Sequence, residues 1–166
     1  MGHPVLRAKA RPVERADIKG AVIQKLIDDM METMTEYHGV GLAAPQVHEH
    51  VRMFVAALDG GDGQIPEPIA IINPEIAVVG TLTVEDWEGC LSIPDIRGRV
   101  PRAREIRVRA FDRRGDRIEL RAENFAARVI QHEADHLDGV LFLDRMRTFE
   151  SLTYLEEYSR YWAKED

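Results

Sequence analysis

The sequence has a single cysteine, Cys90, among its 166 residues. An intramolecular disulfide is therefore excluded, and the chain fits a reducing compartment, with the cytoplasm as the expected location. It also lacks a long apolar run, an N-terminal signal segment and the serine or threonine that a myristoylation signal needs at position 6, where Leu6 stands. These absences predict a protein that neither crosses a membrane nor is anchored to one.

Positive charge is also scarce, since the formal net charge is −7. Proteins that bind nucleic acid generally neutralise its phosphates with lysine and arginine, so direct, general nucleic-acid binding is not expected. One stretch departs from this balance, with arginine at positions 97, 99, 102, 104, 107 and 109. The stretch could attract an anionic group or a peptide carboxylate, but a solvated strand face explains most of these arginines equally well.

The pattern of apolar residues predicts an α+β fold in one domain that spans residues 1–166. Apolar spacings of three and four predict an amphipathic helix over 17–37 and another over 149–162. Residues 59–68 are rich in glycine and proline and are expected to form a surface loop. Strands are predicted at 51–57, 69–72 and 76–84, and a hairpin joins 106–110 to 118–120 through a turn at 112–116. We expect small antiparallel sheets around a central helix.

The most informative segment is Gln131–Gly139, which contains the pattern His132-Glu133-x-x-His136. Positions four apart lie about 40° apart around an α-helix, so the two imidazoles can hold one ion. Glu133 is placed to take a proton from a water at that ion, as in helical metal-hydrolase sites. Asn124 is expected to be the N-cap of this central helix and Gly139 its C′ residue.

The two histidines leave the third metal ligand open. A metzincin would have a third histidine at position 142, where this chain has Phe142. A thermolysin-like peptidase would use a glutamate about twenty residues after the second histidine, a count that Glu156 or Glu157 satisfies. Cys90 is the other candidate, giving two imidazoles, one thiolate and an open fourth position.

Three segments make the sequence resemble the peptide deformylases, of the type I, bacterial or organelle-like kind. They are G-x-G-L-A-A-x-Q at Gly39–Gln46, E-G-C-L-S at Glu88–Ser92 and Q-H-E-x-D-H-L-x-G at Gln131–Gly139. The resemblance begins with G-x-P-x-L-R at Gly2–Arg7 and continues to about Met146. The family's chains usually begin several residues earlier, so Met1 is expected to be a shortened or misassigned start.

The resemblance implies an enzyme that removes the formyl group from the initiator methionine of nascent polypeptides and releases formate. Cys90, His132 and His136 would hold one divalent metal, usually Fe²⁺ in the family, with Zn²⁺, Ni²⁺ or Co²⁺ as alternatives. Glu133 would take a proton from the attacking water and deliver it to the departing amine. The Gln46 side-chain amide and the Leu91 backbone N–H would stabilise the developing oxyanion.

The resemblance also assigns the rest of the site. The Arg128 stem is expected to lie on an apolar wall with its charged head in water. The residues that could orient the metal ligands are Glu88, Gln131 and Asp135. The residues implied to bind the substrate are Val40, Gly41, Arg97, Phe125, Arg128 and Val129.

The implied partners are formylated nascent peptides. A basic terminal helix docks some family members on the ribosome, but residues 149–166 of this chain are mainly acidic, which weakens the case for such a contact. The apolar side of the terminal helix would pack on the domain or on a second subunit, so a homodimer stays open. The alternative functions are a thermolysin-like metallopeptidase that uses Glu156 and an inactive, deformylase-like metal-binding protein.

Overall fold

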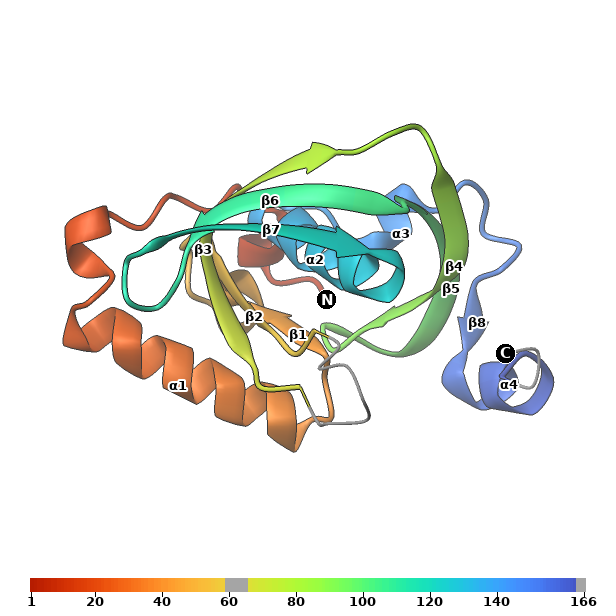
Figure 1. Cartoon of the computed structure of the whole chain (residues 1–166). Helices are drawn as coiled ribbons and strands as arrows, with labels where there is room; N and C mark the ends of the chain where they lie inside the picture. The colour runs from red at the N-terminus through yellow and green to blue at the C-terminus, as the bar shows by residue number, and fades with distance from the viewer. Residues whose placement is uncertain (59–65, 164–166) are drawn as a thin grey trace.

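The computed structural model describes residues 1–58 and 66–163, and it confirms the predicted α+β fold. A five-stranded antiparallel sheet has the order β1-β2-β3-β6-β7, and a smaller sheet has the order β4-β5-β8. Helix α2 lies between the two sheets, whereas α1 runs along the outside of the larger one (Figure 1). The helices are α1 Ala21–Glu36, α2 Asn124–Leu137, α3 Phe142–Arg145 and α4 Leu155–Tyr161. The strands are β1 Gly41–Ala43, β2 Met53–Ala56, β3 Ile69–Val78, β4 Thr83–Cys90, β5 Ile93–Ala103, β6 Glu105–Phe111, β7 Arg117–Glu123 and β8 Thr153–Tyr154.

Helix α2 is fixed in the core by a fully buried apolar face. Ala127, Ile130 and Leu137 have no exposed surface and pack against side chains of β2, β3 and β6. Gly139 is the predicted C′ residue, since its φ is +72° and its N–H donates to the carbonyl of His136. The prediction of Asn124 as N-cap is wrong. Strand β7 runs directly into the helix, so its last residue, Glu123, is the extended cap.

Helix α1 confirms the amphipathic pattern but is shorter than the predicted range 17–37. Residues Arg15–Asp17 form a separate 3₁₀ turn, and the extended backbone of Gly20 delays the helix to Ala21. Its buried face covers the sheet side opposite α2. Among the described residues, no helix is both long enough and apolar enough to cross a membrane.

The predicted strands at 69–72 and 76–84 are wrong in their boundaries, because one continuous strand, β3, covers Ile69–Val78. The register of β3 against β6 shifts between Ile72 and Glu75. Asn73 sits at this bulge with a φ of +52°, and its side chain bonds both the N–H and the carbonyl of Val13. Asparagine tolerates this left-handed conformation better than most residues do. The polar residue that interrupts the apolar run thus kinks the strand without ending it.

The hairpin predicted around residues 112–116 is confirmed by the pairing of β6 with β7. The Asp112 carboxylate accepts hydrogen bonds from the N–H groups of Arg114 and Asp116. Gly115 supplies the positive φ that the turn requires, +78°. By contrast, most of the predicted loop at 59–68 lies outside the described residues.

The C-terminal helix is much shorter than the predicted range 149–162. Thr153 and Tyr154 form β8, which adds to the edge of β5, so only Leu155–Tyr161 remain helical. The helix packs on the domain through aromatic rings. The Trp87 ring centroid lies 5.0 Å from that of Tyr158 and 5.8 Å from that of Trp162.

Candidate metal centre

Three donor atoms from two separate elements meet beside α2. Cys90 ends β4, where a bulge interrupts the pairing with β5, while His132 and His136 lie one turn apart on α2. One ligand atom from each residue lies within 4.8 Å of the others, and Cys90 Sγ is 3.3 Å from His136 Nε2. Over residues 1–58 and 66–163, this is the one group of three or more histidine, cysteine, aspartate or glutamate side chains so arranged.

The donor set fits a divalent transition metal. Tetrahedral ligands with a sulfur bond of about 2.3 Å and a nitrogen bond of about 2.05 Å are roughly 3.5 Å apart, close to the observed sulfur–nitrogen spacing. Thiolate and imidazole suit zinc, iron, cobalt and nickel better than magnesium or calcium. Two of the donors, Cys90 and His136, are buried, whereas His132 opens toward a cavity. The centre therefore has protein on one side and room for a small molecule on the other.

Glu88 contacts the first histidine, as expected of a residue that could orient a metal ligand. Its Oε2 is 2.9 Å from His132 Nδ1, which leaves Nε2 of that ring free for the metal side. Burial alone would raise the pKa of Glu88, but hydrogen bonds from His132 and Arg102 outweigh it and lower the pKa to about 2. The Glu88 carboxylate therefore stays ionised in the folded protein.

Arg102 connects Glu88 to the other predicted orienting acid, Asp135. It donates from Nε to Glu88 Oε1 at 2.8 Å and from Nη1 to Asp135 Oδ2 at 2.6 Å, and it is only 5% exposed. Asp135 also accepts from Arg145. Gln131 lies outside this network, because its side-chain amide bonds the backbone N–H and carbonyl of Ala103 and so pins the end of β5 to α2. Gln131 therefore supports the centre through the backbone.

Replacing Arg102 with methionine is expected to lower the free energy of unfolding by about 3–5 kcal/mol, because two buried carboxylates would lose their shared counter-charge. Urea denaturation measures this effect. Arg107→Met is the matched control, since Arg107 pairs with Glu119 at an exposed site and its loss should cost less than about 1 kcal/mol. Equal losses in the two variants would contradict the assigned role of the buried network.

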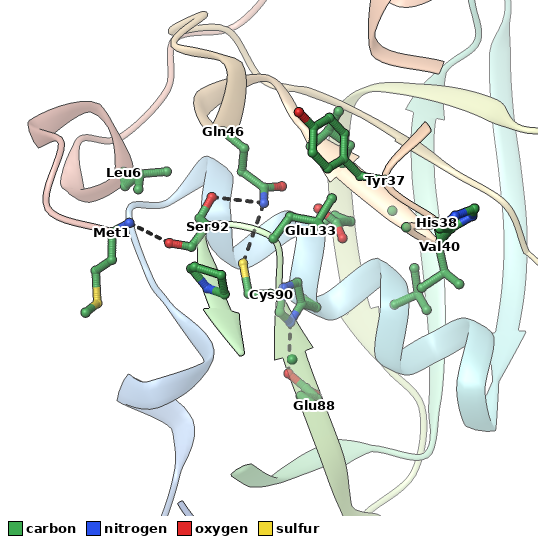
Figure 2. Close-up of a pocket in the computed structure, with 18 of the residues that line it drawn as sticks. Met1, Leu6, Tyr37, His38, Val40, Gln46, Glu88, Cys90, Ser92 and Glu133 are labelled. Atoms are coloured by element: carbon green, nitrogen blue, oxygen red, sulfur yellow. Dashed lines mark hydrogen bonds and ion pairs between the residues drawn. The ribbon is translucent and has the colours of Figure 1, made fainter. Parts of the chain in front are cut away.

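Gln46 turns its amide nitrogen toward the centre. Its oxygen accepts from the Ala43 N–H at 2.8 Å, and its Nε2 lies 3.2 Å from Ser92 Oγ and 3.5 Å from Cys90 Sγ. Figure 2 shows these two contacts of the Gln46 amide with Ser92 and Cys90. The Ala43 bond fixes which end of the amide faces the metal ligands, so Gln46 presents a neutral donor there. The role of the Ser92 hydroxyl was missed from sequence, although Ser92 lies inside a recognised motif.

Glu133 is almost completely enclosed, with one carboxylate oxygen, Oε2, that has no hydrogen-bond partner among the described residues. Burial is the main cause that raises the pKa of Glu133, to about 7. Gly41 packs directly against it, because a Cβ at position 41 would lie 2.3 Å from Glu133 Oε1. Because this pKa lies near 7, the carboxylate can both accept and release a proton near neutral pH.

A cavity of about 790 Å³ opens from the metal ligands. Leu91, whose backbone N–H the resemblance assigns to the oxyanion, lines it. The predicted substrate-binding residues all line it, namely Val40, Gly41, Arg97, Phe125, Arg128 and Val129. The structure therefore gathers the residues that the resemblance named from β1, β5 and α2 and, for Val40, from the position directly before β1.

The prediction for the Arg128 head is wrong. The side chain is 6% exposed, and its guanidinium bonds Glu88 Oε1 at 2.8 Å and the backbone carbonyls of Val84 and Val100 at 2.7 and 2.8 Å. Backbone carbonyls of the β4–β5 hairpin and a buried carboxylate attract the charge more strongly than water does. Arg128 therefore closes one end of the cavity.

Glu156, the alternative third ligand, lies away from the metal ligands. It is exposed on α4 and pairs with Arg160 one turn further along the helix. Its carboxylate does not belong to the donor group formed by Cys90 and the two histidines. The structure gives the thermolysin-like arrangement no support.

The chain is similar, in sequence and in fold, to proteins of one family. Residues 1–151 match the family described as polypeptide deformylase. The chain is 45% identical to peptide deformylase 2 of Nostoc sp., over 99% of this chain and 93% of that protein. A peptide deformylase of Thermotoga maritima is 47% identical over 87% of this chain and 83% of its own length.

Solved structures agree with the sequence matches. The crystal structure of the Thermotoga maritima peptide deformylase superposes with a TM-score of 0.79 at 45% identity, covering 89% of this chain and 95% of that one. A class I type b peptide deformylase from Acinetobacter baumannii, with Met-Ala-Ser bound, superposes with a TM-score of 0.82 at 35% identity, covering 88% and 94%. The family match over residues 1–151 includes Cys90, His132 and His136.

Proposed function

The chain belongs to the peptide deformylase family and is a hydrolase, and we propose that it removes the formyl group from formyl-methionine at the start of nascent polypeptides. The observation that carries the proposal is the meeting of Cys90, His132 and His136 with Glu133 and Gln46 at one cavity. A metal site with a purely structural role would need neither a buried carboxylate without a partner nor an amide donor.

Cys90, His132 and His136 would hold one divalent ion, for which we propose Fe²⁺ as the native metal, with Zn²⁺, Ni²⁺ or Co²⁺ as substitutes. When bound, such an ion acts as a Lewis acid on the formyl oxygen and lowers the pKa of water. Metal analysis of protein purified without oxygen tests the identity of the ion.

The proton moves through Glu133. Its carboxylate takes a proton from water as the water oxygen bonds to the formyl carbon, and it then delivers that proton to the amide nitrogen as the carbon–nitrogen bond breaks. The products are formate and a peptide with a free methionine amine. Gly41 leaves space for the carboxylate, and the raised pKa lets one group serve both steps.

The developing negative charge on the formyl oxygen needs donors, and we assign these to Gln46 Nε2 and the Leu91 N–H. The bond between the Ala43 N–H and Gln46 Oε1 supports this role, because it keeps the amide from flipping. Because the Gln46 amide is uncharged, it can donate to the oxyanion without forming an ion pair with the Glu133 carboxylate.

The methionine side chain is placed against the apolar wall formed by Val40, Phe125 and Val129, with Arg97 close to the peptide backbone. The relative that binds Met-Ala-Ser supports a substrate that continues beyond the methionine. Arg128 limits the depth of this pocket, since its head is held by Glu88.

The decisive experiment is formate release from formyl-Met-Ala by iron-loaded protein under oxygen-free conditions. We expect steady turnover, with no acetate released from acetyl-Met-Ala, because an added methyl group would crowd the carbon beside the metal ligands. Absence of formate release by correctly metallated protein would overturn the proposal.

Gly41→Ala is expected to reduce kcat/KM about 100-fold, because the new methyl group would displace the Glu133 carboxylate by an ångström or more. Gly39→Ala is the matched control, since its Cβ would approach no atom closer than 3.3 Å, a flexible end of the Leu91 side chain. Thermal unfolding of both variants separates a local effect from loss of the fold. A similar loss of activity in the two would argue against the Gly41 contact.

The proposed place of action is the cytoplasm, with formylated nascent chains as partners. Transient contact with the ribosome and formation of a homodimer remain proposals, tested by co-sedimentation with ribosomes and by analytical ultracentrifugation. The acids Glu156 and Glu157 on α4, of which Glu156 is exposed, argue for a ribosome contact elsewhere than this helix.

A further inference from the structure

The C-terminal segment reaches the catalytic cavity, although it follows the part of the chain that matches the family, residues 1–151. Leu155, the first residue of α4, lines the cavity together with Trp87 of β4 and Arg97 of β5. Figure 1 shows β8 and α4 beside the β4–β5 hairpin and apart from α2. These three residues form one wall of the cavity, and Leu155 is the one among them that lies outside residues 1–151.

Two sets of contacts hold this wall in place. Thr153 pairs with Arg97 in the sheet, which fixes the backbone immediately before Leu155. The Trp87 ring packs edge-on against Tyr158 and is tilted against Trp162. Because both strand pairing and ring packing position α4, Leu155 has a defined place relative to Trp87.

The wall continues from the metal ligands toward the surface. A Cβ on Gly89, the residue before Cys90, would lie 2.1 Å from Arg97 Nη1, so the Arg97 side chain covers the backbone beside that ligand. Leu155 and Asp95 line the catalytic cavity and also a second hollow of about 460 Å³. Leu155 therefore borders both spaces.

This wall is separate from the one assigned to methionine. The methionine wall consists of Val40, before β1, and of Phe125 and Val129 on α2, whereas Leu155 and Trp87 come from α4 and β4. Neither Leu155 nor Trp87 has a part in the proton transfer or in binding the formyl group. Both are only half-buried, so they offer apolar surface to a molecule in the cavity.

We propose that Leu155 and Trp87 determine specificity for the residues that follow formyl-methionine, favouring an apolar side chain there. This inference rests on the proposed deformylase function and deepens it. The substrate peptide would extend from the metal ligands along Arg97 to Leu155, and burial of an apolar side chain against the two residues would lower KM. Leu155 therefore acts on binding of the distal peptide and not on bond cleavage.

The test uses formyl-Met-amide and a set of formyl-Met-(Ala)₄ peptides in which leucine replaces each alanine in turn. With the wild-type protein, leucine at one of the four positions is expected to lower KM about five- to tenfold, the effect of burying much of one aliphatic side chain. In Leu155→Ala this advantage should disappear, with kcat preserved, and Leu155→Met should restore most of it. Trp87→Ala should reduce the same advantage.

Tyr161→Ala is the matched control, because Tyr161 lies on the same helix but lines neither space. The leucine advantage should persist in this variant. The inference is overturned if leucine gives no advantage at any position, or if Tyr161→Ala removes the leucine advantage as well. It is also overturned if His48→Ala, a change at another residue that lines the cavity, removes the leucine advantage while Leu155→Ala does not. Absence of formate release from formyl-Met-amide by the wild-type protein would instead overturn the proposed function.

Discussion

Glu133→Gln is expected to reduce formate release by roughly 10³- to 10⁴-fold while the bound metal stays at the wild-type level. The glutamine side chain has nearly the same size as glutamate and so still fits against Gly41, where a Cβ would lie only 2.3 Å from Glu133 Oε1. It cannot, however, carry a proton from water to the amide nitrogen of the substrate. The effect should fall on kcat, because the carboxylate is assigned to proton transfer and not to holding the peptide in the cavity.

The measurement combines steady-state kinetics with metal analysis of the same preparation. Glu119→Gln is the matched control, since Glu119 is exposed on β7 and pairs only with surface arginines. Glu133→Ala should be as inactive as Glu133→Gln. Turnover above about a tenth of the wild-type rate in fully metallated Glu133→Gln would refute the role given to this residue.

Cys90→Ala is expected to lose both metal and activity. Replacing residues that merely support metal ligands typically weakens metal binding by 10–100-fold, so removing a ligand should cost more than about 100-fold. Alanine leaves only a small void, because Cys90 packs with Ile93 and Phe142 in a satellite cluster of the core. The loss should therefore appear in metal content before it appears in the fold.

Metal titration of the apo-protein and formate release measure the two effects, and circular dichroism checks the fold. Glu156→Ala provides the comparison, because it removes the third ligand of the thermolysin-like alternative. Deformylase chemistry requires that Glu156→Ala keep metal and activity. The reverse result, with Cys90→Ala active and Glu156→Ala inactive, would return the site to a peptidase of the thermolysin kind.

The two histidine ligands could be predicted from sequence because their signal is local, whereas Cys90 was assigned through the family resemblance, since the residues alone left the third ligand open. His132 and His136 are one helical turn apart, and the three motifs around Gln46, Cys90 and Glu133 are short, continuous segments that can be read directly from the sequence. Helix α1 was predicted for the same reason, since its periodicity needs no knowledge of distant residues.

The errors arose where distant parts of the chain decide the outcome. Strand β8 forms because Thr153 pairs with Arg97, more than fifty residues earlier. The bulge at Asn73 is held by Val13, whose N–H donates to the Asn73 side chain and whose carbonyl accepts from it. The head of Arg128 is drawn inward by carbonyls of β4 and β5 that no helical pattern reveals. Long-range pairing, and not local propensity, determines these features.

The origin of the three ligands has a mechanical consequence. Cys90 belongs to the hairpin of the smaller sheet, whereas His132 and His136 belong to the helix packed on the larger one. A bound ion would link the two layers, so the free energy of metal binding would add to the free energy of unfolding. Catalytic competence and resistance to unfolding are thus coupled through the same three atoms.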